Sequence, residues 1–128
     1  MPIALQDNES PIFIVGAARS GTTLLQYMLR SHPEISLPTA ESHFFIPLYL
    51  RRQEFSDLQK IEALEDLIEQ IYQAKKNFFD DDLHGIKFDT QALALECKKQ
   101  NLSTIPSIIS YIFMKNAIAE GKKRWGDK

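Results

Sequence analysis

The first organised stretch of the chain pairs a short apolar run with a helical pattern. Residues 11–16, PIFIVG, are apolar without interruption and rich in β-branched side chains. Such a run is typical of a strand buried on both faces of a parallel sheet. Residues 22–30 carry apolar side chains on one face of a predicted helix, namely Leu24, Leu25, Met28 and Leu29. This helix is expected to end at residues 31–33, Ser-His-Pro, because the residue before a proline avoids the helical conformation.

A second helical pattern follows in the middle of the chain. Ser56 and Gln59 have the spacing of a capping box, which marks a helix start. Apolar residues then recur at helical spacing from Leu58 to Tyr72, with acidic and basic residues on the other face. The pattern predicts an amphipathic helix that reaches about Lys76.

The remaining segments are shorter or less regular. Residues 34–38, EISLP, predict a second short strand, and residues 40–45, AESHFF, are typical of a loop or a strand edge. A last helix is expected from about Thr104 to Glu120, with a proline in its first turn and a glycine just beyond its end. A strand, a loop and several helices indicate an α/β domain in which only the first strand is clearly defined.

Composition and charge narrow the functional classes. The 128 residues are 44% hydrophobic and 25% charged, which argues against a disordered or low-complexity chain. A net charge of −2 gives no indication of a nucleic-acid-binding protein. The single cysteine, Cys97, allows no internal disulfide and is expected to be a small apolar residue of a helix.

Targeting signals are not evident in the sequence. Residues 1–10 are polar and have neither the basic nor the apolar region of a signal peptide. No window is apolar enough to predict a membrane span, so a cytoplasmic location is expected. The expected organisation is a tail of residues 1–10 and one domain of residues 11–128.

The turn between the first strand and the first helix carries the candidate chemistry. Residues 16–23, GAARSGTT, have the glycine spacing of a P-loop, in which backbone N–H groups and a helix start cradle phosphate. A nucleotide hydrolase has lysine where Thr22 stands, and a Mg-bound triphosphate would lose its main cation without that lysine. The positive charge lies instead at Arg19, which favours a ligand ending in a single phosphate-linked group.

These residues resemble a known family. Residues 11–35, with the core R-S-G-T-T and the downstream His-Pro, resemble the 5′-phosphosulfate-binding segment of the sulfotransferases, which use 3′-phosphoadenosine 5′-phosphosulfate (PAPS) as donor. Residues 41–45, ESHFF, resemble the E-x-H-F-F stretch of the heparan sulfate sulfotransferase branch. Residues 125–128, WGDK, are similar to the start of the W-G-D-K-T-P segment of many bacterial members.

The resemblance implies a role for each matching residue. The loop amides and threonine hydroxyls would hold the 5′-phosphate of the donor, and Arg19 would neutralise charge on the bridging oxygen as sulfate leaves. Glu41 would be the general base on the acceptor hydroxyl, with His43 as its neighbour. Such a transfer depends on positioning, charge stabilisation and a base, and no metal is expected. The implied donor-binding set is Arg19, Ser20, Gly21, Thr22 and Thr23, and the implied catalytic set is Arg19, Glu41 and His43.

The resemblance also implies which fold the chain adopts and how much of the family's domain it contains. The expected fold is a P-loop-like parallel sheet flanked by helices, with few strands and a mostly helical C-terminal half. The family binds the 3′-phosphate of the donor through a further segment that follows W-G-D-K-T-P. That segment would lie beyond Lys128, so the chain is expected to be an incomplete, N-terminal part of a sulfotransferase domain with weak PAPS binding and little turnover.

Two other functions stay open at this point. A nucleotide kinase or another phosphotransferase could use the same loop, although the missing lysine argues against it. A non-catalytic helical module could bind a partner through the apolar face of residues 58–72. The acceptor is also open, because the E-x-H-F-F stretch favours a carbohydrate hydroxyl while tyrosine, lipid and small-molecule acceptors use related architectures. The oligomeric state is not predicted.

Overall fold

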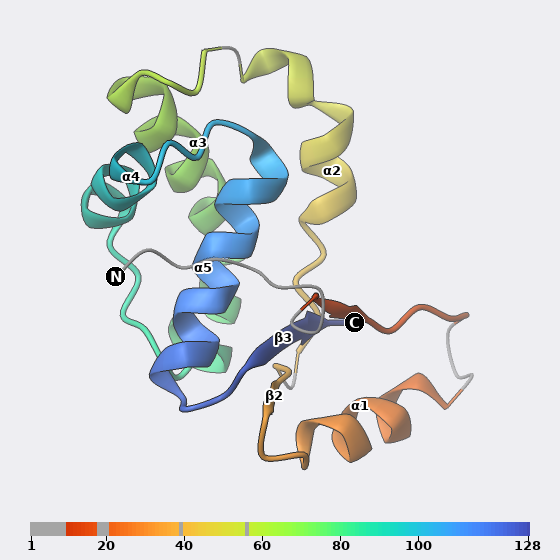
Figure 1. The fold of residues 1–128 in the computed structure, drawn as a ribbon. Helices are drawn as coiled ribbons and strands as arrows, with labels where there is room; N and C mark the ends of the chain where they lie inside the picture. The colour runs from red at the N-terminus through yellow and green to blue at the C-terminus, as the bar shows by residue number, and fades with distance from the viewer. Residues whose placement is uncertain (1–9, 18–20, 39, 56) are drawn as a thin grey trace.

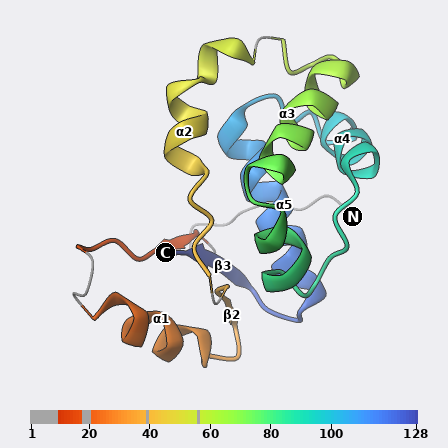
Figure 2. The ribbon, with the colours of Figure 1, turned by 180° about the vertical axis from the view of Figure 1, so that it is seen from behind.

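A small parallel sheet lies between one helix on one side and a group of helices on the other (Figures 1 and 2). The computed structural model describes residues 10–17, 21–38, 40–55 and 57–128. The helix α1 spans Thr22–Arg30 and lies on the lower side of the sheet in Figure 1. The helices α2 (Phe45–Leu50), α3 (Ile61–Ala74), α4 (Thr90–Lys99) and α5 (Ile105–Ala119) form the group on the opposite side. The predicted α/β fold with parallel strands flanked by helices is therefore confirmed.

The sheet is built from segments at both ends of the described chain. Its strands are β1 (Ile12–Phe13), β2 (Ile35–Ser36) and β3 (Arg124–Asp127), in the order β1-β3-β2. Both pairings are parallel, with Ile12 opposite Gly126 and Ile35 opposite Arg124. The central strand β3 was not predicted, because two lysines precede it and its four residues show no alternation of apolar and polar side chains.

Close packing explains why β3 has the sequence Arg-Trp-Gly-Asp. Trp125 is buried and stacks on Phe113 of α5, with ring centroids 4.6 Å apart. A Cβ atom on Gly126 would lie only 2.5 Å from the carbonyl oxygen of Ile12. The strand therefore carries a large anchor beside a glycine that allows β1 to approach.

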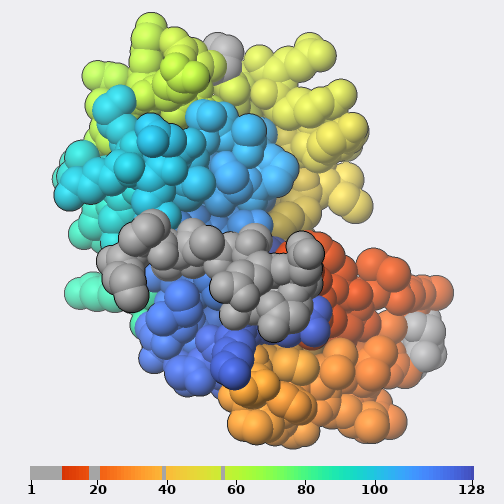
Figure 3. Space-filling model, viewed as in Figure 1, coloured from red at the N-terminus to blue at the C-terminus, as the bar shows by residue number. Residues whose placement is uncertain are grey.

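The burial predicted for the first strand was wrong. Residues 11–16 were expected to be buried on both faces, but Val15 is 87% exposed and Phe13 is also exposed. Among the described residues, β1 pairs only with β3, so it is an edge strand rather than a central one. The apolar face of α1 is also largely exposed, with Leu24 at 68%. Gln26 of the same helix is buried, and its Nε2 donates to the carbonyl oxygen of Pro38 at 2.6 Å. The narrow sheet leaves most of α1 uncovered, as Figure 3 shows at lower right.

The bounds of the first elements otherwise follow the predicted ones. The helix α1 starts at Thr22 and its C-cap is Ser31, as expected from the following His-Pro pair. The second strand is confirmed in a shorter form as β2. The short helix α2 and the 3₁₀ turn η2 (Arg52–Glu54) come after the loop of residues 40–44 and were not predicted.

The middle helix is confirmed, but its start was predicted too early. It begins at Ile61 with Lys60 as N-cap, and Lys60 makes no side-chain capping hydrogen bond. The predicted N-cap Ser56 lies outside the described residues. Four apolar side chains of α3 are fully buried in the main core, namely Leu64, Leu67, Ile68 and Ile71. The hypothesis that the chain is a non-catalytic module that binds a partner through this face loses its support, because the face packs inside the molecule.

The last helix matches its predicted bounds closely. Thr104 caps α5 through a capping box with Ser107, and Gly121 follows the helix with a φ of 76°. Cys97 lies buried in α4, and burial raises the pKa of its thiol to about 12. A thiol with so high a pKa is protonated at neutral pH and is a poor nucleophile. A π-helical turn, η3 (Phe78–Asp82), connects α3 to the segment before α4.

Within the described ranges, no helix combines the length and the hydrophobicity that crossing a membrane requires.

Candidate functional site

The glycine loop, the segment after β2 and the end of β3 surround one hollow. Its volume is about 700 Å³. It is lined by Gly16, Ala17, Gly21, Thr22 and Thr23 of the loop region, together with Ile14, Val15, Glu41 and Lys128. The carboxyl ends of parallel strands meet at one edge of a sheet, which is where open α/β folds bind ligands. The chain therefore places its candidate residues where this class of fold binds phosphate-bearing molecules.

The start of α1 provides backbone donors to this hollow. Gly21 is the N-cap residue with a φ of 88°, a left-handed conformation that glycine adopts without strain. The first helical hydrogen bond runs from the amide of Leu25 to the carbonyl oxygen of Gly21 at 3.2 Å. The amides before Leu25 belong to the first turn, whose N–H groups have no partner within a helix. These donors and the positive end of the helix suit an anion.

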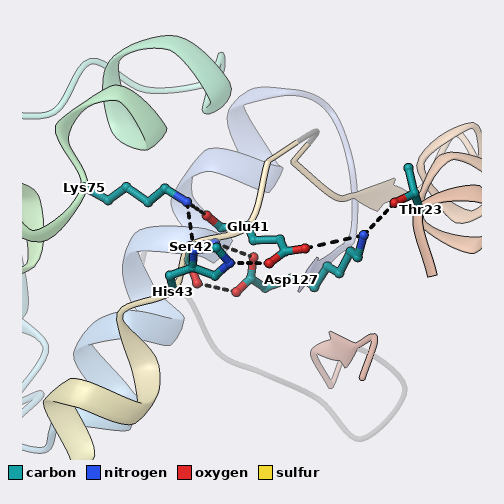
Figure 4. A network of polar contacts seen from close by, with 7 residues as sticks. Thr23, Glu41, Ser42, His43, Lys75 and Asp127 are labelled. Carbon is teal, nitrogen blue, oxygen red and sulfur yellow. Dashed lines mark hydrogen bonds and ion pairs between the residues drawn. The ribbon is translucent and has the colours of Figure 1, made fainter. Parts of the chain in front are cut away.

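Lys128 connects the loop to the predicted base. Its Nζ donates to Thr23 Oγ1 at 2.8 Å and lies 3.4 Å from Glu41 Oε1. The side chain of Lys128 is largely buried, so its charge is directed into the hollow rather than dispersed in solvent. Figure 4 shows this line of contacts from Lys75 through Glu41 to Thr23.

His43 and Lys75 hold the other side of Glu41. His43 Nε2 makes a hydrogen bond to Glu41 Oε2, and Lys75 Nζ donates to the carbonyl oxygen of Glu41. Lys75 Nζ also lies 3.3 Å from His43 Nδ1. Because an ammonium group can only donate, Nδ1 is the acceptor and Nε2 carries the hydrogen that faces Glu41. Oxygen Oε1 of Glu41 is then the one that faces Lys128 and the loop.

The backbone between Glu41 and His43 is fixed by Asp127 of β3. Both the amide and the hydroxyl of Ser42 donate to the Asp127 carboxylate, the amide at 3.3 Å. Ser42 and Asp127 are both buried, and burial raises the pKa of Asp127 while the Ser42 bonds act against the rise. His43 has a φ of 60°, which is uncommon for a residue other than glycine and costs backbone energy. The contact with β3 thus holds Glu41 and His43 in place.

The electrostatics of the site keep Glu41 ionised. The hydrogen bond from His43 is the main cause that lowers the pKa of Glu41, and Lys128 lowers it further, while partial burial acts in the opposite direction. A carboxylate with a lowered pKa is present in its charged form at neutral pH, but it is also a weaker base.

The structure thus gathers Gly21, Thr22, Thr23, Glu41 and His43 around the end of β3. Arg19 and Ser20, which the sequence also singled out, lie outside the described residues. Lys128 was missed as a site residue, although it belongs to the quoted WGDK segment. No local pattern marks Lys128 as a site residue, because only the pairing of β3 with β1 brings it to the loop. Among the described residues, no group of three or more potential metal ligands comes together.

Comparison with known families agrees with this geometry. The fold and the site define a parallel α/β protein with a glycine-containing loop beside a hollow at the carboxyl edge of its sheet. A family model described as "Sulfotransferase family" matches residues 11–125. The chain therefore belongs to the sulfotransferase family, which indicates a transferase of sulfuryl groups. Searches of curated proteins and of solved structures found no match.

Proposed function

We propose that this chain provides the donor loop and the base of a site that transfers a sulfuryl group from PAPS to an acceptor hydroxyl. The observation that carries the proposal is the single hollow in which the loop amides, Glu41 and Lys128 face one another. An anion held by the loop and a hydroxyl held at Glu41 would meet in this hollow. Membership of the sulfotransferase family supports the choice of a sulfuryl group over other anionic groups.

The donor side of the proposal rests on the first turn of α1. The amides and hydroxyls of Thr22 and Thr23 bind the 5′-phosphate, with Ser20, Gly21 and Arg19 completing the loop. Lys128 joins this set, because its ammonium group already contacts Thr23 and a neighbouring anion would replace Glu41 as its partner. Charge-assisted hydrogen bonds of this kind are stronger than neutral ones.

The transfer step places Glu41 as the base. As the acceptor oxygen forms its bond to sulfur, the hydroxyl proton passes to Glu41. The bond between sulfur and the bridging oxygen breaks, and its electron pair stays on that oxygen, which becomes part of the released adenosine 3′,5′-bisphosphate. Arg19 and Lys128 stabilise the negative charge that develops there.

Donor binding also activates the base in this scheme. In the structure, His43 and Lys128 both lower the pKa of Glu41. When Lys128 turns to the donor anion, Glu41 loses one of these two partners and its pKa rises. Glu41 therefore becomes a stronger base only when the donor is present, and His43 keeps its orientation.

A phosphotransferase that uses Mg-ATP is the alternative that one observation favours. Lys128 provides a cation in the same hollow as the loop and could replace the lysine that is missing at position 22. The two functions differ in the nucleotide that they bind. Calorimetric titration of the chain with adenosine 3′,5′-bisphosphate, and separately with ATP and Mg²⁺, distinguishes them. Tighter binding of Mg-ATP would refute the sulfuryl-transfer proposal.

Lys128 provides the sharper test by mutation. Lys128→Met is expected to weaken binding of adenosine 3′,5′-bisphosphate by about tenfold to a hundredfold, as for the loss of a hydrogen bond to a charged group. Lys123→Met is the matched control, because Lys123 is an exposed lysine just before β3 that pairs with Glu34. Equal affinities of the two variants would exclude Lys128 from the donor site. Transfer of labelled sulfate from PAPS then tests the chemical step: little turnover is expected of the 128-residue chain and more of a version extended beyond Lys128, and full activity of the short chain would contradict the expected incomplete domain.

A further inference from the structure

We infer that Lys75 is a positioning residue of the site: its ammonium group occupies the basic nitrogen of His43 and so leaves Glu41 as the base of the pair. This inference rests on the proposed function, in which the proton of the acceptor hydroxyl passes to Glu41. Glu41 and His43 both belong to the predicted catalytic set, and either type of side chain can act as a general base. Lys75 decides between them.

Lys75 reaches the site from the end of α3. It is the C-cap residue of this helix, and its φ of −156° shows that the backbone leaves the helical conformation there. Ile71 before it and Phe78 after it are fully buried in the main core, so the backbone at residue 75 is anchored on both sides. Lys75 itself is half-buried. Figure 4 shows its side chain extended toward Glu41 and His43.

Two contacts of the ammonium group with residues 41–43 define this role. Nζ donates to the carbonyl oxygen of Glu41 and lies 3.3 Å from Nδ1 of His43. An ammonium group has three hydrogens to donate and no lone pair, so Nδ1 provides the lone pair of the second contact. The other ring nitrogen, Nε2, then carries the hydrogen that bonds to Oε2 of Glu41. Both ring nitrogens of His43 are therefore engaged.

A histidine held in this way is a poor base for an acceptor in the loop hollow. To take up a proton, His43 would need the lone pair of Nδ1, which faces Lys75. A doubly protonated ring would also place a positive charge against the ammonium group, which electrostatic repulsion opposes. Glu41 lines the loop hollow, whereas His43 lines a neighbouring hollow beside β1. A proton released in the loop hollow therefore passes to Glu41, and His43 keeps its single hydrogen.

The carboxylates around His43 act in the opposite direction to Lys75. Glu41 accepts from Nε2. Burial raises the pKa of Asp127, and the charge of His43 is among the influences that lower it, so these two groups also interact. Both carboxylates favour a positively charged ring. Lys75 is the cation in contact with the ring, so its removal should let His43 take up a second proton.

The same ammonium group helps to hold a strained turn. His43 has a φ of 60°, and this left-handed backbone costs free energy that surrounding contacts must offset. Asp127 binds the amide and hydroxyl of Ser42 from β3, and Lys75 binds the carbonyl oxygen of Glu41 from α3. The turn that carries the base is thus held from two sides.

Two neighbouring lysines at the end of α3 provide the test. Lys75→Met keeps an unbranched side chain but removes the ammonium group. Lys76→Met makes the same substitution at an exposed residue whose charge acts on Glu69 instead. Circular dichroism verifies that both variants keep the fold.

The measurement is nitrogen-15 NMR of the histidine rings at neutral pH, in which His43→Asn identifies the signals of His43. We expect the wild-type chain to show a hydrogen on Nε2 and a bare Nδ1. In Lys75→Met, the ratio of doubly protonated to neutral His43 is expected to rise about tenfold, as for the removal of one adjacent positive charge. Lys76→Met should leave these signals in place, and the exposed His84 should respond to neither variant.

Two results of this measurement would overturn the inference. One is a wild-type His43 that carries its hydrogen on Nδ1, and the other is a set of His43 signals that Lys75→Met leaves unchanged. The first result needs no variant, so it tests the inference even if Lys75→Met fails to fold.

Titration with adenosine 3′,5′-bisphosphate separates this inference from the proposed function. The described lining of the loop hollow includes Glu41 but not Lys75, so Lys75→Met is expected to change the affinity for this nucleotide less than about twofold. A wild-type chain that does not bind the nucleotide would refute the proposed function, and the role of Lys75 in it would fall as well. If only Lys75→Met lost affinity, as strongly as Lys128→Met, Lys75 would belong to the donor site and this inference alone would be wrong.

Discussion

The helical group and the sheet-and-loop region use apolar residues in opposite ways. In the helical group, α3 and α5 bury most of their large apolar side chains in one core. Around the sheet, several apolar side chains are exposed on β1 and α1, while Gln26, Ser42 and Asp127 are buried and hydrogen-bonded. One region therefore stabilises the molecule, whereas the other holds polar groups in fixed positions beside open surface, as a binding site requires.

The largest expected difference between the two regions concerns stability. Leu67→Ala in α3 removes a fully buried side chain and is expected to lower the free energy of unfolding by about 2–5 kcal/mol. Leu24→Ala in α1 makes the same substitution at an exposed position and is expected to change it by less than about 0.5 kcal/mol. Urea unfolding followed by circular dichroism measures both. Equal losses would show that α1 is covered in solution.

A smaller effect distinguishes two glycines with the same backbone conformation. Gly21 precedes α1 with a φ of 88°, and Gly121 follows α5 with a φ of 76°; a Cβ atom would meet no neighbour at either position. Alanine at either position is expected to lower the free energy of unfolding by about 1–2 kcal/mol, because a residue with a Cβ atom is strained in the left-handed conformation. Only Gly21→Ala should also weaken adenosine 3′,5′-bisphosphate binding, because only Gly21 lines the loop hollow. If Gly121→Ala weakened that binding as much, general loss of stability would explain both results.

The smallest expected effect is a change in the titration of Glu41. Its pKa lies below the ordinary value of 4.5, chiefly because of the hydrogen bond from His43. The folded state therefore gains stability from ionised Glu41 above pH 4.5 and loses it as pH falls through the lowered pKa. The gain is small because the side chain is partly exposed.

His43→Asn tests this assignment. Asparagine tolerates the left-handed backbone of residue 43 but is too short to keep the same bond, so the pKa of Glu41 is expected to rise toward its ordinary value. Carbon-13 NMR of the side-chain carboxyls measures the shift directly. Glu69 is the internal control, since Gln73 and Thr90 lower its pKa, and it should not respond. An unchanged Glu41 would mean that His43 is not its main partner.

Local patterns predicted the elements whose signals lie within a few residues. The bounds of α1 follow from the glycine loop before it and the His-Pro pair after it, and those of α5 from Thr104, Pro106 and Gly121. The sequence alone also indicates the loop, from its glycine and threonine spacing, and the candidate base Glu41. Their catalytic and donor-binding roles remain predictions, as do those of Arg19 and Ser20.

Other features depended on contacts between distant segments. Trp125 gave no sign of a central strand, because β3 is defined by its pairing with β1 and β2 rather than by its own pattern. The exposed face of α1 has the same spacing as the buried face of α3, so periodicity could not tell which of the two would be covered. Neither local pattern contains information about the partner that covers a surface.

The sequence by itself determined a loop with the chemistry to bind phosphate, the helices around it and a carboxylate 20 residues beyond Gly21. Only the tertiary structure decided that this carboxylate faces the loop, and that Lys128 lies between them. The physical reason is that parallel pairing brings the carboxyl ends of β1 and β3 to one edge, so residues separated by most of the chain share one hollow.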